Sequence, residues 1–299
     1  MLHGPGSTAP RARPSRTSRA SRVALARAPL IPVVALIAVG VVVGAARVAR
    51  AETAAAPDVV SAPAPDEVRV TRPWLYVDDP TIAAPLHVVG SSGVSVTTTG
   101  SSPTRPFASN VAHPGGAYEV GAEVGLLPRL ALHVSGVTSG VTASNGIGVG
   151  MIAGLRVALV DAGSTRITAS AGVLREISEG TGAWARVTVA QDVGRARLAL
   201  TAHGEHVFAG GRDAVDVMLM AGASVGLFGP LRGGVEYVVQ DLEGAIDGEE
   251  AEQGVRHFVG PNLSLELDRR RLHVTAGPAI GLSYDSPRLL ARAAIAYSF

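Results

Sequence analysis

Residues 271–284 read RLHVTAGPAIGLSY, and two kinds of side chain alternate along this stretch. One side of the extended chain is aliphatic, with Leu272, Val274, Ala276, Pro278, Ile280 and Leu282. The other side is small or polar, with His273, Thr275, Gly277, Ala279, Gly281 and Ser283. A period of two residues is that of a β-strand. At this length, with one aliphatic side, the pattern indicates a strand that crosses a membrane.

The same alternation recurs from residue 86 to the end of the chain, broken by turn residues. A soluble sandwich also alternates, but its strands average about five or six residues. The sequence therefore predicts an all-β fold, a transmembrane antiparallel up-and-down β-barrel over residues 86–299. Twelve strands fit best, since an even number is typical of bacterial single-chain barrels, and ten is the alternative. The predicted strands are 86–99, 116–126, 129–137, 148–160, 165–175, 182–193, 195–208, 213–227, 230–242, 255–267, 271–284 and 287–299.

The links between these strands alternate in length. Outer-membrane barrels have short periplasmic turns and longer outer loops, so this sorting favours a barrel. The final link, around Asp285, is short and departs from the pattern. The short links are 127–128, 161–164, 194, 229–230 and 268–270, and the longer ones are 100–115, 138–147, 176–181, 209–212 and 243–254.

The N-terminal 51 residues have the pattern of a secretory signal peptide. An arginine-rich stretch, 11–27, precedes the apolar run 28–46, and Ala49-Arg50-Ala51 forms a small-x-small cleavage site. An uncleaved signal anchor is the alternative, because the run is nearly long enough to span a bilayer. Residues 52–85 are rich in Ala, Pro and Asp, and we expect a flexible periplasmic segment there.

The formal charge of +1 comes from this targeting segment. Eight of the 26 basic residues lie within residues 1–51, which leaves 18 basic residues against 25 acidic ones, a net charge of −7. The basic excess is therefore no sign of nucleic-acid binding. The chain has no Cys, which excludes disulfides and thiolate chemistry. No zinc-type His cluster, phosphate-binding Walker loop or serine elbow occurs, so we expect no metal and no cofactor.

The chain ends with RLLARAAIAYSF, residues 288–299, and its aliphatic and aromatic side chains share one face up to the final Phe. With the signal peptide, this ending resembles the terminal signal of Gram-negative outer-membrane β-barrels, the porin-like class. The resemblance implies an outer-membrane location, contact with outer-membrane lipid, and insertion by the barrel-assembly machinery, with Tyr297 and Phe299 as the assembly signal. A chance apolar tail on a soluble secreted protein is the alternative.

The inward side of the predicted barrel carries charges of both signs, and buried charges must pair or face water. Eight-stranded barrels are filled by side chains and much larger ones hold a water channel. Between these limits, the sequence favours a narrow passive pore for small solutes over a solid barrel. The lumen-lining candidates are Glu119, Glu123, Arg156, Arg186, Arg197, His203, Glu205, Asp216, Glu236, Asn262, Glu266, His273 and Arg292.

Two alternative functions remain. His133 and Ser135 lie two residues apart on one strand face, which resembles the motif of outer-membrane phospholipase A and the lipid A deacylases and implies an outer-leaflet lipid-modifying enzyme. Here Gly136 follows the serine in place of Asn, and the alternation turns the pair inward, so we expect no enzyme. A surface adhesin or structural barrel is the other alternative, acting through long loops such as the acidic 241–254. Carboxylates of that loop suit divalent cations or a cation-selective mouth, although a solvated loop is the simpler interpretation.

Overall fold

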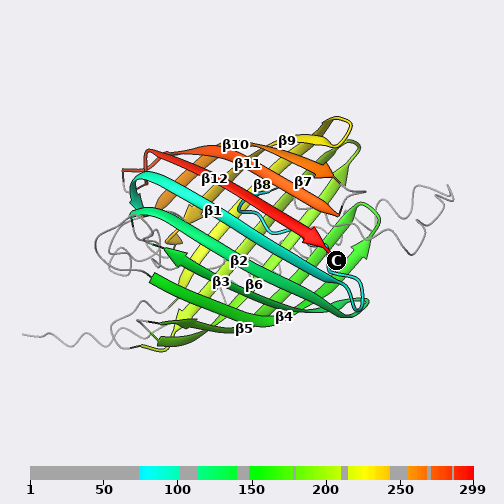
Figure 1. The fold of residues 1–299 in the computed structure, drawn as a ribbon, viewed down its shortest axis with the longest axis horizontal. Helices are drawn as coiled ribbons and strands as arrows, with labels where there is room; N and C mark the ends of the chain where they lie inside the picture. The colour runs from blue at the N-terminus through cyan, green and yellow to red at the C-terminus, as the bar shows by residue number, and fades with distance from the viewer. Residues whose placement is uncertain are drawn as a thin grey trace, which may run out of the picture.

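The structure is a computed structural model that describes residues 74–101, 114–139, 148–177, 180–209, 215–242, 255–267, 271–284 and 286–299. In these residues, twelve strands pair antiparallel with their chain neighbours, and β1 pairs with β12 to close a barrel (Figure 1). The strands are β1 (Val88–Ser101), β2 (Pro114–Leu127), β3 (Leu130–Ser139), β4 (Gly148–Ala162), β5 (Thr165–Glu176), β6 (Gly180–Val193), β7 (Ala196–Val207), β8 (Asp216–Phe228), β9 (Leu231–Gln240), β10 (Arg256–Leu267), β11 (Leu272–Gly281) and β12 (Leu289–Ser298).

The predicted barrel of twelve strands is confirmed. Every strand ends within three residues of the position predicted from the alternation. Within the described ranges, no helix is long and apolar enough to cross a membrane. The proposed signal peptide and residues 243–254 of the acidic loop lie outside the described residues.

Short turns join the strands at one end of the barrel, and the C-terminus lies at that end (Figure 1). Three of these turns contain a glycine in the left-handed region: Gly163 with φ 55°, Gly194 with φ 58° and Gly229 with φ 53°. An L-residue with a Cβ is strained at such a φ, whereas glycine is not. Glycine at these three positions therefore allows antiparallel strands to reverse within very few residues.

The two faces of the barrel differ as the alternation predicts. On β7, Leu198 and Leu200 are exposed on the outside, whereas Arg197, Thr201 and His203 are buried on the inside. Large aliphatic side chains are exposed in the same way around the wall, among them Leu132, Leu155, Val235, Leu263 and Ile280. A continuous apolar band of this kind is unfavourable in water and matches a hydrocarbon environment. The outer face is therefore a lipid-facing surface.

The inner face is less polar than the alternation indicates. Towards the end opposite the short turns, the lumen contains a cluster of buried apolar side chains: Ala117, Val137, Ile152, Leu174, Trp184 and Val207. The Trp184 ring fits because Gly154 lies beside it, and a Cβ at Gly154 would come within 2.7 Å of the ring. Strand parity turns these side chains inward together with the charged ones, so this end of the lumen is apolar while other parts carry charge.

Residues 74–85, which precede β1, lie inside the barrel, and we call this segment the plug. Its first seven residues, Trp74 to Pro80, are all buried, and they contact inward side chains from opposite sides of the wall. The sequence predicts a flexible periplasmic segment over residues 52–85. For residues 74–85 the structure differs, because their apolar and acidic side chains have partners in the lumen. Residues 52–73 lie outside the described residues.

The lipid-facing surface can be tested by placing one charge at two depths on β7. We expect Leu200→Arg, near the middle of the strand, to destabilise the folded barrel by about 2–4 kcal/mol, because arginine there must enter the bilayer midplane. At the end of the strand, Phe208→Arg should cost only about 0–1 kcal/mol. Denaturant unfolding in lipid vesicles measures both changes, and equal costs at the two positions would contradict a membrane-spanning β7.

Candidate functional site: a plugged lumen

The plug is amphipathic along its length. Trp74, Leu75, Tyr76 and Val77 are apolar, and the next two residues are acidic. The four apolar residues pack in one cluster with inward side chains of the wall, which include Met218, Met220, Val238, Phe258, Ala279 and Leu290. The Tyr76 ring also lies 4.7 Å from the guanidinium carbon of Arg292, a cation–π contact. The apolar half of the plug is therefore held by burial of its side chains against β8–β12.

Glu236 of β9 binds the backbone of this apolar half. Its carboxylate accepts hydrogen bonds from the N–H groups of Leu75 at 2.5 Å, Tyr76 at 2.6 Å and Val77 at 3.2 Å. Asn262 of β10 donates a further hydrogen bond to the same carboxylate at 2.6 Å. A segment that joins no sheet leaves its backbone donors without ladder partners, and a buried unpaired donor is costly. Glu236 supplies one charged acceptor for three consecutive donors.

Close packing around the indole of Trp74 explains why residue 222 is a glycine. A Cβ at Gly222 of β8 would come within 2.7 Å of the indole nitrogen of Trp74 and 3.0 Å of Cγ2 of Val77. Any larger residue at this position would push against the plug. Gly222 is therefore where the plug and the wall come closest on β8.

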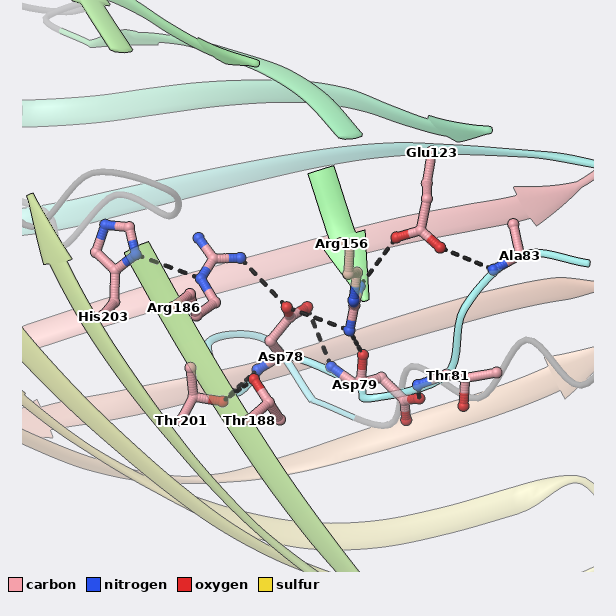
Figure 2. Close-up of polar contacts among 10 residues, drawn as sticks. All are labelled: Asp78, Asp79, Thr81, Ala83, Glu123, Arg156, Arg186, Thr188, Thr201 and His203. Atoms are coloured by element: carbon pink, nitrogen blue, oxygen red, sulfur yellow. Dashed lines mark hydrogen bonds and ion pairs between the residues drawn. The ribbon is translucent and has the colours of Figure 1, made fainter. Parts of the chain in front are cut away.

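The acidic half of the plug contacts arginines on the other side of the lumen (Figure 2). Oδ2 of Asp78 lies 3.3 Å from a guanidinium nitrogen of Arg156 and 3.3 Å from one of Arg186. The backbone N–H of Asp78 donates to Oγ1 of Thr201 at 3.2 Å. Asp79 lies 3.4 Å from Arg197, and its carbonyl oxygen accepts a hydrogen bond from Arg156. Three buried arginines on β4, β6 and β7 therefore surround two plug carboxylates.

The wall arginines also hold carboxylates of their own. Glu123 lies 2.9 Å from Arg156, and its other oxygen accepts a hydrogen bond from the Ala83 N–H at 2.8 Å. Asp192 binds Arg197 through both of its oxygens, at 2.5 and 2.9 Å. Arg156 and Arg197 are therefore neutralised in part by carboxylates of the wall itself.

Arg186 has a different set of neighbours. Its Nε donates to Nδ1 of His203 at 3.3 Å, and its guanidinium carbon lies 5.5 Å from the centre of the Trp184 ring. Because arginine only donates, Nδ1 of His203 accepts, and Nε2 is then the nitrogen that donates to Glu205 at 3.1 Å. Among the described residues, Asp78 of the plug is the carboxylate in direct contact with Arg186.

The plug leaves the lumen near the short-turn end of the barrel. Pro85 forms a bridge with Gly125 of β2, and the Leu86 N–H donates to the Gly125 carbonyl at 2.9 Å. Leu86 has φ 66°, a left-handed conformation unusual for leucine, at the point where the chain turns into β1. This corner connects the plug to the wall through the backbone.

The structure places the predicted lumen residues as follows. All are buried except Glu119 and Glu266, which are partly buried. Glu119 pairs with Arg292 at 2.6 Å. The plug contacts bring six of the set together: Glu123, Arg156, Arg186, Arg197, Glu236 and Arg292.

Sequence reasoning did not assign the plug's own residues to the site. Strand parity gives no information for a segment that is not a strand. The available signal is the change from four apolar to two acidic residues at 74–79, within a stretch otherwise rich in Ala and Pro.

His133 and Ser135 of β3 both point inward. The Ser135 hydroxyl donates to the carbonyl oxygen of Val120 at 3.2 Å. The His133 ring lies edge-on to Trp184, with ring centroids 6.3 Å apart. A pair that cleaves lipid must reach the outer face, and this pair is on the lumen side. In the described part of the chain, no group of three His, Cys, Asp or Glu side chains is placed to hold a metal ion.

Two small cavities lie beside the plug. A cavity of about 40 Å³ lies beside Trp74, Glu119 and Arg292, and one of about 10 Å³ lies beside Tyr76 and Phe258. Cavities of this size hold a few water molecules at most. The plug and the wall side chains around it leave no room for a solute in these two cavities.

Comparisons with known proteins place the fold in a class. No protein-family model matches the sequence, and no curated protein is significantly similar to it. Among solved structures, the chain is similar to the KdgM porin, with 8% identity and a TM-score of 0.50 over 71% of this chain and 99% of that chain. It is also similar to the Ralstonia pickettii toluene transporter TbuX, with 10% identity and a TM-score of 0.42 over 73% of this chain and 90% of that chain.

At such low identity, the likeness to the KdgM porin shows the fold alone. The fold is that of the porin-like outer-membrane β-barrels of Gram-negative bacteria, and the apolar outer band fits a membrane. This agrees with the class and the outer-membrane location that the sequence predicts.

The role of Glu236 in holding the plug can be tested with a single thiol. Because the chain has no Cys, Val77→Cys introduces one reactive group at a buried plug position. Glu236→Gln removes the charge that three N–H groups share, and hydrogen bonds to charged groups contribute about 1.5–3 kcal/mol. We expect maleimide labelling of Val77→Cys to be faster by about tenfold or more in the Glu236→Gln background.

Asp161→Asn is the matched control, because it makes the same acid-to-amide change at an exposed position near a short turn, where Asp161 contacts Arg166. Maleimide should label Val77→Cys in the Asp161→Asn background at the same rate as Val77→Cys alone. Equal rates in the Glu236→Gln background would show that Glu236 does not hold the plug.

Proposed function

We propose that the protein is an outer-membrane pore for small solutes whose passage is closed by its own plug and opens when the plug leaves the lumen. The observation that carries this proposal is the way the plug is held. In the described residues, its partners in the wall are side chains, apart from the backbone bridge between Pro85 and Gly125 at its end. The strand ladder around the barrel is closed by β1 and β12. Departure of the plug would therefore leave that ladder intact.

The polar wall beneath the plug supports the same proposal. Arg156, Arg186, Arg197 and Glu236 are buried while the plug covers them. Buried charges need partners or water, and a departing plug would be replaced by water around these groups. A barrel with a permanently filled lumen would need only apolar side chains at these positions, like those at the opposite end of the lumen.

The fold is one that porins use. The KdgM porin, which the chain resembles with a TM-score of 0.50, has a barrel of this kind, and this likeness supports a pore. For the present chain, the identity of the solute rests on its own lumen residues.

In the described residues, His133 and Ser135 face the lumen and the Ser135 hydroxyl donates to a backbone carbonyl, an arrangement that does not suit the lipid-modifying alternative. Most of the acidic loop 241–254 lies outside the described residues. Its first residue, Asp241, is buried and pairs with Arg256 at 2.5 Å. The proposal therefore stays with a pore.

A reversible tether between plug and wall tests this function. The double variant Val77→Cys with Gly222→Cys joins the plug to β8, because Cγ2 of Val77 lies 3.0 Å from an ideal Cβ at Gly222, close enough for a disulfide. In planar bilayers, we expect the oxidised protein to show no open steps. Reductant should restore the openings of the Gly222→Cys single variant, in which the added Cβ already shifts the Trp74 indole.

Each single-cysteine variant serves as a control and should not respond to reductant. Open steps of equal size and frequency in the oxidised protein would overturn the proposal, because the passage would then not need the plug to move. If neither the oxidised nor the reduced protein shows open steps, the proposal is also overturned, and the barrel is permanently filled.

A further inference from the structure

The plug occupies a position in the lumen that combines three kinds of contact. Glu236 accepts consecutive backbone N–H groups, Arg292 and Phe258 flank an aromatic ring, and Arg156 and Arg186 bind a carboxylate. The first two contacts come from strands β9 to β12, and the third comes from β4 and β6. We call these wall residues the plug seat.

The arginine part of the seat holds the carboxylate of Asp78. Arg156 and Arg186 approach the same oxygen of Asp78, both at 3.3 Å, and their side chains are about 3% and 4% exposed. Two guanidinium groups this close exclude a cation. Glu123 on Arg156, and Glu205 behind His203, place negative charge nearby. A carboxylate therefore suits the position better than a dianion such as phosphate.

The remainder of the seat recognises a peptide. The three donors bound by Glu236 are successive N–H groups of one chain, a spacing that sugars and simple organic acids do not offer. The aromatic ring of Tyr76 is bound two residues before the carboxylate of Asp78. The wall around the ring is apolar and includes Val238, Phe258 and Ala279.

We infer that the plug seat is a binding site for short acidic peptides that carry an aromatic residue two positions before a carboxylate, and that such peptides compete with the plug. This inference rests on the proposed function, in which the plug leaves the lumen. The plug then acts as an internal competitor that occupies the solute site until a peptide of the right chemistry replaces it.

Fluorescence of Trp74 reports the competition without any measurement of conductance. The chain has two tryptophans, so Trp184→Phe leaves Trp74 in the plug as the single reporter. Adding the blocked tripeptide acetyl-Tyr-Val-Asp-amide, which copies residues 76–78, should shift the emission to longer wavelength as the indole enters water. The companion peptide acetyl-Tyr-Val-Asn-amide lacks the charge and should need about a tenfold higher concentration, since charge-assisted hydrogen bonds contribute about 1.5–3 kcal/mol.

Two arginine variants decide whether the advantage of the acid comes from the seat. In Arg186→Gln, the acid and amide peptides should become equally effective, because a carboxylate partner is lost. Arg232→Gln is the matched control: this arginine also faces the lumen, and its hydrogen bond goes to Ser224 at 3.3 Å. It should keep the preference for the acid. Asp78→Asn should lower the concentration of acid peptide needed, because the plug then competes less strongly.

Equal potency of the two peptides in the unmodified seat would overturn the inference, as would a preference that survives Arg186→Gln or disappears in Arg232→Gln. Conductance through the tethered double variant tests the pore separately. A plug that peptides displace from a barrel that never conducts would refute the pore and leave the peptide site standing. A conducting barrel whose plug is not displaced by the peptides would refute the peptide site and leave the pore standing.

Discussion

The pairing of β1 with β12 is the constraint on which the rest of this structure depends. In hydrocarbon, an unpaired backbone N–H or C=O has no water to bind, so a sheet with free edges cannot be stable there. The pairing from Val89 with Ser298 to Thr97 with Leu290 removes both edges. The last residue completes it, because the Phe299 N–H donates to the Val88 carbonyl at 2.9 Å. Once the ring is closed, alternate side chains must face lipid and lumen.

Closure creates an interior that has to be filled or hydrated, and this barrel fills it in two ways. Near the longer loops, large apolar side chains of the adjacent strands β2 to β7 pack together around Trp184 on one side of the lumen. In the remainder, the plug occupies the space between charged side chains on one side of the wall and apolar side chains on the other. Filling the lumen with a separate segment has a physical consequence that filling it with wall side chains does not. In the described residues, the plug's backbone joins the wall at Pro85, so under the proposed function it leaves without disturbing the ladder.

The plug supplies the carboxylates that pair with the arginines of the lumen. Considered alone, Arg156, Arg186 and Arg197 are three cations buried within one side of a barrel. With the plug in place, Asp78 and Asp79 lie against them, and the chain then turns at Thr81, whose N–H donates to Asp79 at 2.8 Å (Figure 2). The wall carboxylates Glu123 and Asp192 limit the positive potential that remains. In the peptide site that we infer, this balance of charge favours weakly anionic groups.

The sequence by itself determined the barrel: its twelve strands, its lipid and lumen faces and its short turns. These follow from a period of two residues and from turn glycines such as Gly194, which are local properties of the chain. It also determined that Glu236 and Arg186 point inward, because parity settles that within a single strand. Only the tertiary structure decided what they bind. The contacts of Leu75 with Glu236 and of Asp78 with Arg186 join residues more than one hundred positions apart. No periodicity records such a pairing, because it exists only after the barrel has closed around the segment.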